Sequence, residues 1–247
     1  ELLKAQKTVE TLYSALSNTL GGDESTYIPA TSMFILNDIE SVSYFKDLAK
    51  QHSPLLKQVG YKKQLATENM RLQRADFAPQ VALTGMAAFY NYQVSPIIPK
   101  WAVGAGVSLK IFDGLNREYK FSAAKSQIRQ VEAVGHQAES DILTLIDKLY
   151  NEMVTYSQQL PSVNASGRFA EEYLRIKEEA FKEGAAPSSD VVDARLNLAK
   201  IRIERLQAAY YYDMMLARLL EACGQSELFP DYGKRAAAMP IRYEHDF

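Results

Sequence analysis

The sequence predicts a mainly α-helical chain with one small β-hairpin, in which long helices pack as antiparallel coiled coils. Two observations support this fold class. From Asn116 to Gly184 the pattern stays helical for about 69 residues, roughly 100 Å at ~1.5 Å per residue, which is more than a compact globule of this size needs. From Trp101 to Ile111 apolar residues instead alternate with small or polar ones, which is the period of a β-strand.

Composition narrows the classes of protein to consider. The 247 residues carry 28 Lys and Arg against 30 Asp and Glu, a formal charge of −2, so no basic excess argues for a nucleic-acid partner. The single cysteine, Cys223, cannot form an internal disulfide, and its apolar neighbours indicate a buried thiol at a helix end. The sequence has no run of ~18 apolar residues, so no transmembrane helix is predicted. That criterion does not exclude a membrane-spanning β-strand, because the signal of such a strand is alternation rather than a continuous apolar run.

The first 79 residues are predicted to contain three helices. Residues 1–20 form a helix ended by Gly21-Gly22, because leucines and Val9 recur near helical spacing. Residues 21–52 are a connector that ends in a short helix, Ser41–Gln51. Residues 53–79 are a helix that leads into the hairpin, with Ser53 as its N-cap and Pro54 at its first position. Ala78-Pro79 closes it.

Residues 80–112 are predicted to form the β-hairpin. One face of its second strand is apolar throughout: Trp101, Val103, Ala105, Val107, Leu109 and Ile111. A weaker version of this face occurs in the first strand: Val81, Leu83, Gly85, Ala87 and Phe89. The loop Asn91–Lys100 gathers Phe89, Tyr90, Tyr92 and Trp101 near the tip, where aromatic side chains suit a membrane interface. The alternation matches the ~9–11 residues of a tilted membrane strand; an ordinary soluble hairpin covering helices fits it too.

Residues 113–224 are predicted to form a long helix, a turn and a returning helix, followed by a tail without periodicity over 225–247. The first helix has one heptad seam: Phe121, Ala124, Ile128, Val131, Gly135, Ala138, Ile142, Leu145 and Leu149. Pro161 predicts a kink or break in it. The returning helix, Asp190 to Ala222, has two seams: Val192, Leu196, Ala199, Ile203, Leu206 and Tyr210, and Ala194, Ile201, Ala208, Met215 and Ala222. Two seams require neighbours on two sides, as in a ring of helices.

The order of these elements resembles the TolC family of outer-membrane efflux and secretion channels. The matching segments cover roughly Ser53 to Gly224: Phe77-Ala-Pro79-Gln, Trp101-Ala-Val-Gly-Ala-Gly-Val-Ser-Leu, Ile111-Phe-Asp-Gly114, Ala180-Phe-Lys-Glu-Gly184, Asp190-Val-Val-Asp193-Ala194 and Leu216-Ala-Arg-Leu-Leu-Glu-Ala-Cys-Gly224. Single segments are unspecific, whereas their order and spacing together are informative.

The resemblance implies a homotrimer in the outer membrane of a Gram-negative bacterium, extending into the periplasm. Each protomer would carry two repeats of two strands and two helices, with twelve strands closing one β-barrel above an α-helical barrel. On this basis residues 1–20 are expected to be the last helix of the first repeat, with the second repeat following. The implied function is a passive conduit for small molecules or polypeptides. Its partners would be a periplasmic adaptor (membrane fusion) protein, an inner-membrane pump and outer-membrane lipid, with no nucleic acid.

The resemblance also points to candidate functional positions. The turn would be the periplasmic tip where the adaptor docks: Gly184, Ala185, Ala186, Pro187, Ser188 and Ser189. Asp190 and Asp193 would line the narrow end, where three copies place six carboxylates around one axis and select cations. The alternative is that both aspartates cap the helix N-terminus and stabilise its dipole, and the two roles are compatible. Phe181 and Ala186 replace the tyrosine and arginine that hold the family's best-known entrance shut, so that network is not expected here.

No catalytic or cofactor chemistry is predicted. Gly104 and Gly106 lack the third glycine and the following helix of a nucleotide-binding loop. His52, His136 and His245 are scattered and give no metal-binding spacing. The leading hypothesis is therefore a non-enzymatic channel component, and the alternative is a soluble coiled-coil scaffold without pore activity. The two differ in whether the apolar strand face packs against the protein's own helices.

Overall fold

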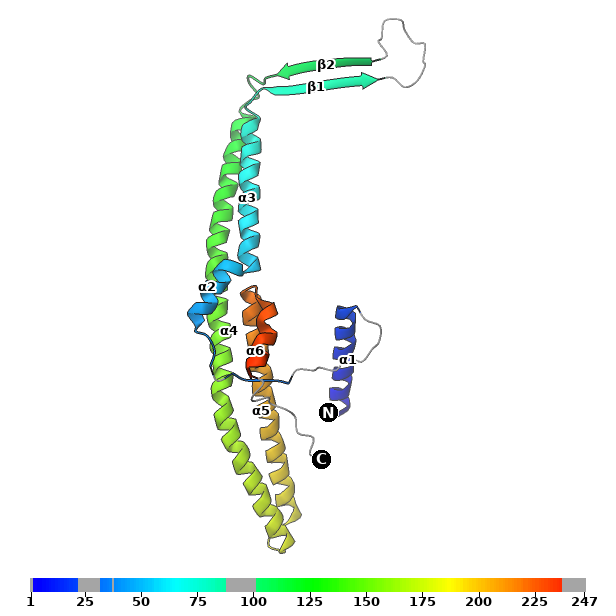
Figure 1. Ribbon diagram of the computed structural model, residues 1–247, viewed down its shortest axis with the longest axis vertical. Coiled ribbons are helices and arrows are strands. Elements are labelled where there is room, and N and C mark those ends of the chain that lie inside the picture. Colours follow the sequence, from blue (N-terminus) through cyan, green and yellow to red (C-terminus); the bar gives the residue numbers. More distant parts are fainter. Residues whose placement is uncertain (1, 22–31, 37, 88–100, 237–247) are drawn as a thin grey trace. The chain divides into compact units, whose positions relative to one another are not determined.

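The computed structural model describes residues 2–21, 32–36, 38–87 and 101–236. The elements along the chain are α1 (Leu2–Leu20), α2 (Val42–His52), α3 (Pro54–Ala75), β1 (Gln80–Ala87), β2 (Trp101–Ser108), α4 (Asn116–Lys182), α5 (Ser188–Ala222), the 3₁₀ turn η1 (Ser226–Leu228) and α6 (Phe229–Ala236). Figure 1 shows them in sequence colours. The chain divides into two compact units, one of residues 42–147 and 221–224 and the other of residues 1–41, 148–220 and 225–247.

In the unit of residues 42–147, α2 and α3 pack in succession along α4. Polar contacts join the helices: Lys46 to Asp147 at 2.6 Å, Lys63 to Glu132 at 3.0 Å, and the Asn69 amide donating to Gln127 at 3.2 Å. Gly135 of α4 lies so close to Val59 that an added Cβ would be 3.3 Å from its methyl group. Small residues on the α4 seam therefore allow α3 to approach closely, as knobs-into-holes packing requires.

The predicted heptad seam of α4 is largely the buried face, with one correction. Ala124, Ala138, Ile142 and Leu149 are buried as expected. Leu145, however, is 41% exposed, and its neighbour Ile146 is fully buried in its place. The straight α-helix repeats every 3.6 residues, so a strict heptad drifts around it and the buried position moves by one residue.

Two sequence predictions are wrong: the kink or break at Pro161, and the capping hydrogen bond from Ser53. α4 continues as a helix through Pro161 for all of its 67 residues, so the proline does not break it. Pro161 is exposed, so water can satisfy the carbonyl that loses its backbone donor. Ser53 stands at the N-cap of α3, with Pro54 following as predicted, but its side chain makes no capping bond. Its hydroxyl is buried and, within the described residues, without a hydrogen-bond partner.

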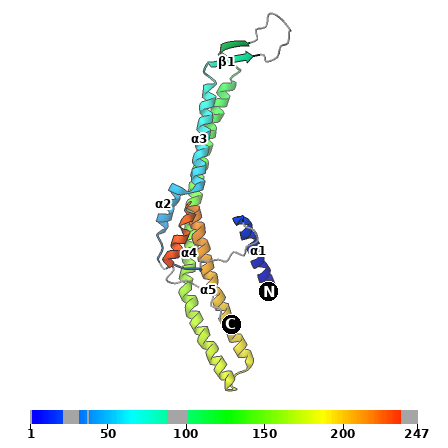
Figure 2. The same cartoon turned by 45° about the vertical axis from the view of Figure 1, so that its right-hand side comes forward.

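In the other unit, the end of α4 and the length of α5 form an antiparallel pair, visible in Figure 1 and from a second direction in Figure 2. Stacked Tyr156 and Tyr211 join the two helices, with ring centroids 5.3 Å apart. Of the two predicted seams on α5, the one containing Ala194, Ala208 and Met215 is buried. The other is mostly exposed: Val192, Leu196, Ile203 and Tyr210 each have more than half of their surface open.

Residues 34–36 and α6 cover the C-terminal part of α5. Phe34, Ile35 and Leu36 are buried, and the Phe34 ring lies against Tyr212 and Phe229 with centroids 6.4 and 5.7 Å apart. Arg235 of α6 pairs with Glu40 at 2.6 Å. The sequence showed no period over 225–247, yet it contains α6, whose Pro230 occupies a first-turn position that suits proline.

Candidate functional site

The turn between α4 and α5 is closed by a left-handed glycine. Gly184 has φ +75° and donates its N–H to the Phe181 carbonyl at 3.0 Å, while Ala185 donates to the Ala180 carbonyl at 2.8 Å. These two bonds constitute a Schellman motif, which ends α4 within one residue and satisfies its last carbonyls. Ala186 also donates to Ala180, at 3.2 Å. The predicted tip is therefore a tight turn.

The other predicted tip residues begin the returning helix. The Pro187 carbonyl accepts the Asp190 N–H at 3.1 Å, Ser188 and Ser189 are the first two residues of α5, and Asp190 lies in its first turn. α5 thus begins two residues earlier than the sequence pattern indicated. Phe181, in the last turn of α4, is 48% exposed. The Asp190 carboxylate, in the first turn of α5, interacts favourably with the positive N-terminal end of that helix dipole.

The two predicted acidic residues differ in their surroundings. Asp190 accepts a hydrogen bond from the Lys177 ammonium at 2.7 Å across the turn. This hydrogen bond raises the pKa of Lys177 above its usual value. Asp193 is exposed, and no cation among the described residues forms an ion pair with it. Of these two aspartates, Asp193 is therefore the one without an ion-pair partner among the described residues.

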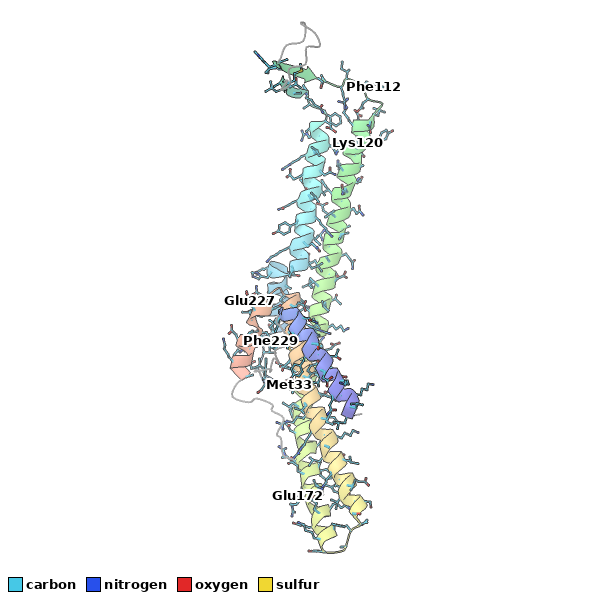
Figure 3. The ribbon with its side chains drawn as sticks, turned by 90° about the vertical axis from the view of Figure 1, so that its right-hand side faces the viewer. Met33, Phe112, Lys120, Glu172, Glu227 and Phe229 are labelled. Atoms are coloured by element: carbon cyan, nitrogen blue, oxygen red, sulfur yellow. The ribbon has the colours of Figure 1, made fainter. Side chains whose placement is uncertain are left out.

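Two further ion pairs tie α4 to α5 behind the tip. Glu178 pairs with Arg195 at 2.6 Å, and Glu171 pairs with Arg202 at 3.6 Å. Figure 3 labels Glu172 on this stretch of α4. In both pairs the acid is on α4 and the base on α5, the reverse of Lys177 and Asp190.

The second candidate region is the hairpin of β1 and β2. The strands pair antiparallel, with Val81 opposite Val107, Leu83 opposite Ala105, and Ala87 opposite Trp101. Because opposed residues share a face, the two predicted apolar faces merge into one. Its large side chains are open: Trp101 is 70% exposed, Val103 69% and Val107 72%. This face does not pack against any helix in the described part of the chain. Phe89, Tyr90, Tyr92 and the loop 91–100 lie outside the described residues.

The second strand is shorter than predicted. β2 ends at Ser108, which is opposite Gln80, so that Leu109 and Ile111 lie beyond the ladder, both exposed. In this register the next partner of Leu109 would be Pro79. Proline has no N–H to donate, so the ladder stops there. The apolar alternation alone could not reveal this limit, because it depends on the register between the strands.

A compact cluster fixes the exit of the hairpin into α4. Gly114 and Leu115 both have positive φ, +72° and +66°. Arg117 lies 3.2 Å from Asp113 with both side chains largely covered, and its guanidinium is 5.1 Å from the centre of the Phe77 ring. The Phe-Asp-Gly segment is thus a turn whose aspartate holds an arginine over an aromatic ring. Figure 3 labels Phe112 in this turn and Lys120 in the first part of α4.

Comparison with known proteins assigns these features to a family. Residues 46–225, most of the chain, match the family model described as outer membrane efflux protein. The chain belongs to the outer membrane efflux protein family. The resemblance to TolC-type channels found in the sequence is thereby confirmed. Comparison with the curated proteins gives no match.

Solved structures of bacterial membrane proteins show the same fold. The outer membrane protein VceC from Vibrio cholerae matches with TM-score 0.68 and 18% identity over 90% of this chain and 54% of that one. The open state of the MtrE channel of Neisseria gonorrhoeae matches with TM-score 0.74 and 18% identity, over 91% and 52%. A membrane protein from Pseudomonas aeruginosa gives 0.71 and 17%, over 90% and 51%. The chain thus spans about half the length of these channels, and the predicted fold class is confirmed.

Within this family member, sequence reasoning missed three functional or structural side chains. Lys177 could have been found by pairing residues at similar distances from the turn, because it lies seven residues before Gly184 and Asp190 six after. Arg117 follows Asp113 by one helical turn, a spacing that favours an ion pair. Asp213, whose carboxylate accepts the Phe34 N–H at 3.2 Å, gave no signal because its partner is 179 residues away. None of the helices in the described ranges combines the length and apolar character needed to cross a membrane.

Proposed function

We propose that this chain forms part of a passive channel in the outer membrane of a Gram-negative bacterium, continuing as a helical tunnel into the periplasm. The conduit exports small molecules or polypeptides in a tripartite efflux or type I secretion system and performs no catalysis. An inner-membrane pump drives transport, and a periplasmic adaptor protein joins the two. The family assignment supports this function, and one feature of the fold carries it.

That feature is the uncovered apolar face of the hairpin. Val81, Leu83, Trp101, Val103 and Val107 lie on one face of β1 and β2, each at least 69% exposed. Both strands also have an edge without a partner strand among the described residues. An apolar face of this kind is unfavourable in water, and a lone hairpin is only marginally stable. Outer-membrane lipid would cover the face, and strands of other repeats and protomers would pair with the edges, closing a β-barrel.

The exposed seam of α5 supports assembly into a homotrimer. Val192, Leu196, Ile203 and Tyr210 follow a heptad spacing and remain open in the single chain. Because the opposite seam is already buried, a second neighbour is required on this side, as in a closed ring of helices. We propose that helices of the adjoining repeat or protomer cover it.

The turn is proposed as the adaptor-docking tip and the pore constriction. Gly184 to Ser189 form the tight turn and the first two residues of α5, and all but the partly exposed Ala186 are exposed, so a partner can contact them. Asp190, Asp193 and Phe181 are placed beside it and would surround the axis of a trimer at its narrow end. Carboxylates repeated by symmetry concentrate cations there. Because Phe181 and Ala186 cannot form a tyrosine–arginine network, closure of this entrance does not depend on one.

The assembly is tested with the full-length protein, including whatever precedes Glu1. It is extracted from membranes in detergent, its oligomeric state is measured by light scattering, and its conductance in planar bilayers. We expect a trimer that requires detergent and opens discrete channels. A monomer that stays in solution without detergent and never conducts would identify the chain as a coiled-coil scaffold instead.

The constriction is tested by a double substitution, Asp190→Ala with Asp193→Ala, in the same bilayers. We expect lower selectivity for cations over anions, because the carboxylates near the axis are lost. A matched control is Glu172→Ala, which removes an exposed carboxylate that pairs with Arg175 on its own helix. Unchanged selectivity of the double variant would assign both aspartates to capping and helix-dipole stabilisation alone.

A further inference from the structure

We infer that Lys177 sets the charge of the proposed constriction by neutralising Asp190, so that of the two aspartates only Asp193 stays uncompensated. This inference rests on the proposed channel function and adds a residue that determines ion selectivity. In a trimer, the number of uncompensated aspartates at the narrow end is then three rather than six.

The Lys177 ammonium and the Asp190 carboxylate form a short contact across the turn. Their nitrogen and oxygen atoms are 2.7 Å apart, and the two side chains are only 26% and 36% exposed. The Lys177 nitrogen also lies 5.5 Å from the centre of the Tyr173 ring, which adds a second favourable contact to the cation. Both contacts hold the ammonium at one place beside the turn.

The Lys177–Asp190 pair has its charges arranged in the opposite sense to the two neighbouring pairs between α4 and α5. Glu178 with Arg195 and Glu171 with Arg202 place acids on α4 and bases on α5. Lys177 is the base on α4 that faces an acid on α5. Asp193 is three residues after Asp190 and has no such base within the described part of the chain. One turn of α5 therefore carries one neutralised and one free carboxylate.

Neutralisation has a measurable consequence for ion permeation. A unit charge at ~10 Å in water, screened over a Debye length of ~8 Å, changes the local concentration of a monovalent ion modestly. Three such charges added together by symmetry change the local cation concentration about 1.8-fold and the anion concentration by the inverse factor, so the cation-to-anion permeability ratio changes about threefold. Removing the lysine and removing its aspartate should shift the ratio in opposite directions.

The test measures reversal potentials of the full-length protein in planar bilayers under a KCl gradient. We expect Lys177→Gln to raise the cation-to-anion permeability ratio about threefold, and Asp190→Asn to lower it by a similar factor. The double variant should return to the wild-type ratio, because the pair is removed as a neutral unit. Lys177→Arg should retain the wild-type ratio. Circular dichroism and the trimer fraction verify that each variant is folded.

Lys125→Gln is the matched control for charge. Lys125 is on the same helix, 52 residues before Lys177, and it forms no ion pair with any described residue. If its substitution shifts the ratio as much as Lys177→Gln, the effect is a general surface charge and the inference is wrong. The inference is also wrong if Lys177→Gln leaves the ratio unchanged while Asp190→Asn lowers it. A wild-type protein that never conducts overturns the proposed function and, with it, this role of Lys177.

Discussion

Two glycines with the same backbone conformation provide a sharp test of the packing. Gly184 and Gly224 have φ of +75° and +70°, and each ends a helix. Their surroundings differ. A Cβ on Gly184 would meet nothing within 4 Å, whereas one on Gly224 would collide with the backbone carbonyl of His52 and lie 2.9 Å from the Pro54 Cδ atom. Alanine at each position separates backbone strain from steric exclusion.

The expected magnitudes follow from these surroundings. Alanine in the left-handed region costs about 1 kcal/mol, and this is the whole effect expected for Gly184→Ala. Gly224→Ala adds a clash with backbone atoms, which cannot rotate away as a side chain can. Overpacking of this kind costs about 2 kcal/mol more. For a chain of this size these values correspond to a fall in melting temperature of about 2–4 °C and about 6–12 °C respectively.

The assay is thermal unfolding of the detergent-purified protein, followed by circular dichroism at 222 nm at one scan rate. The wild type and both alanine variants are compared at equal protein concentration, because assembly contributes to the melting temperature. Equal melting temperatures for the two variants would refute the reasoning, since they would show that the end of α5 can move away from the corner between α2 and α3 without loss.

Three further predictions concern single side chains. Burial raises the pKa of Asp213 to about 7, above its usual ~3.9, so the native state retains the proton and stability falls as pH rises from about 4 to about 7. Asp213→Asn keeps an acceptor for the Phe34 N–H, so it should remove that fall and stabilise the protein at pH 8 by about 1–2 kcal/mol; an unchanged pH profile would contradict this. Cys223 is fully buried and its pKa is raised to about 11 by that burial, so maleimide at pH 8 should label it only after unfolding, and rapid labelling of the native protein would exclude the packing described. Pro161→Ala should restore a helical hydrogen bond and increase the free energy of unfolding by up to about 3 kcal/mol, which would be measured as a higher melting temperature. A lower melting temperature would show that the proline supports a bend the protein needs.

The sequence predicted the elements well because their signals are local. Helix periodicity, the Gly184 turn and the alternation before Ile111 each depend on residues within one or two turns of one another. The end of β2 at Ser108 was not predicted, because it depends on Pro79 in the partner strand. That Ile146 is buried rather than Leu145 was not predicted either, because it depends on how the helix is rotated relative to its neighbour.

The candidate site was only half visible in the sequence. Asp190 and Asp193 are equivalent in the motif, and the sequence gives no reason to treat them differently. The distinction comes from Lys177, which the antiparallel pairing of α4 and α5 brings to Asp190. Spacing along the sequence identifies the residues at the turn, but the ion pair between Lys177 and Asp190 depends on how the two helices face each other in space.

The uncovered hairpin has a consequence for the order of folding. α4 and α5 are joined by one tight turn, so their contacts can form within a single chain soon after synthesis, as contacts of short sequence separation do. In the proposed channel, β1 and β2 acquire stable neighbours only from outside the described residues, so the last step of folding would depend on the concentration of its partners and on a lipid surface. At low abundance we therefore expect a species with finished helices and a protease-sensitive hairpin, accumulating ahead of insertion.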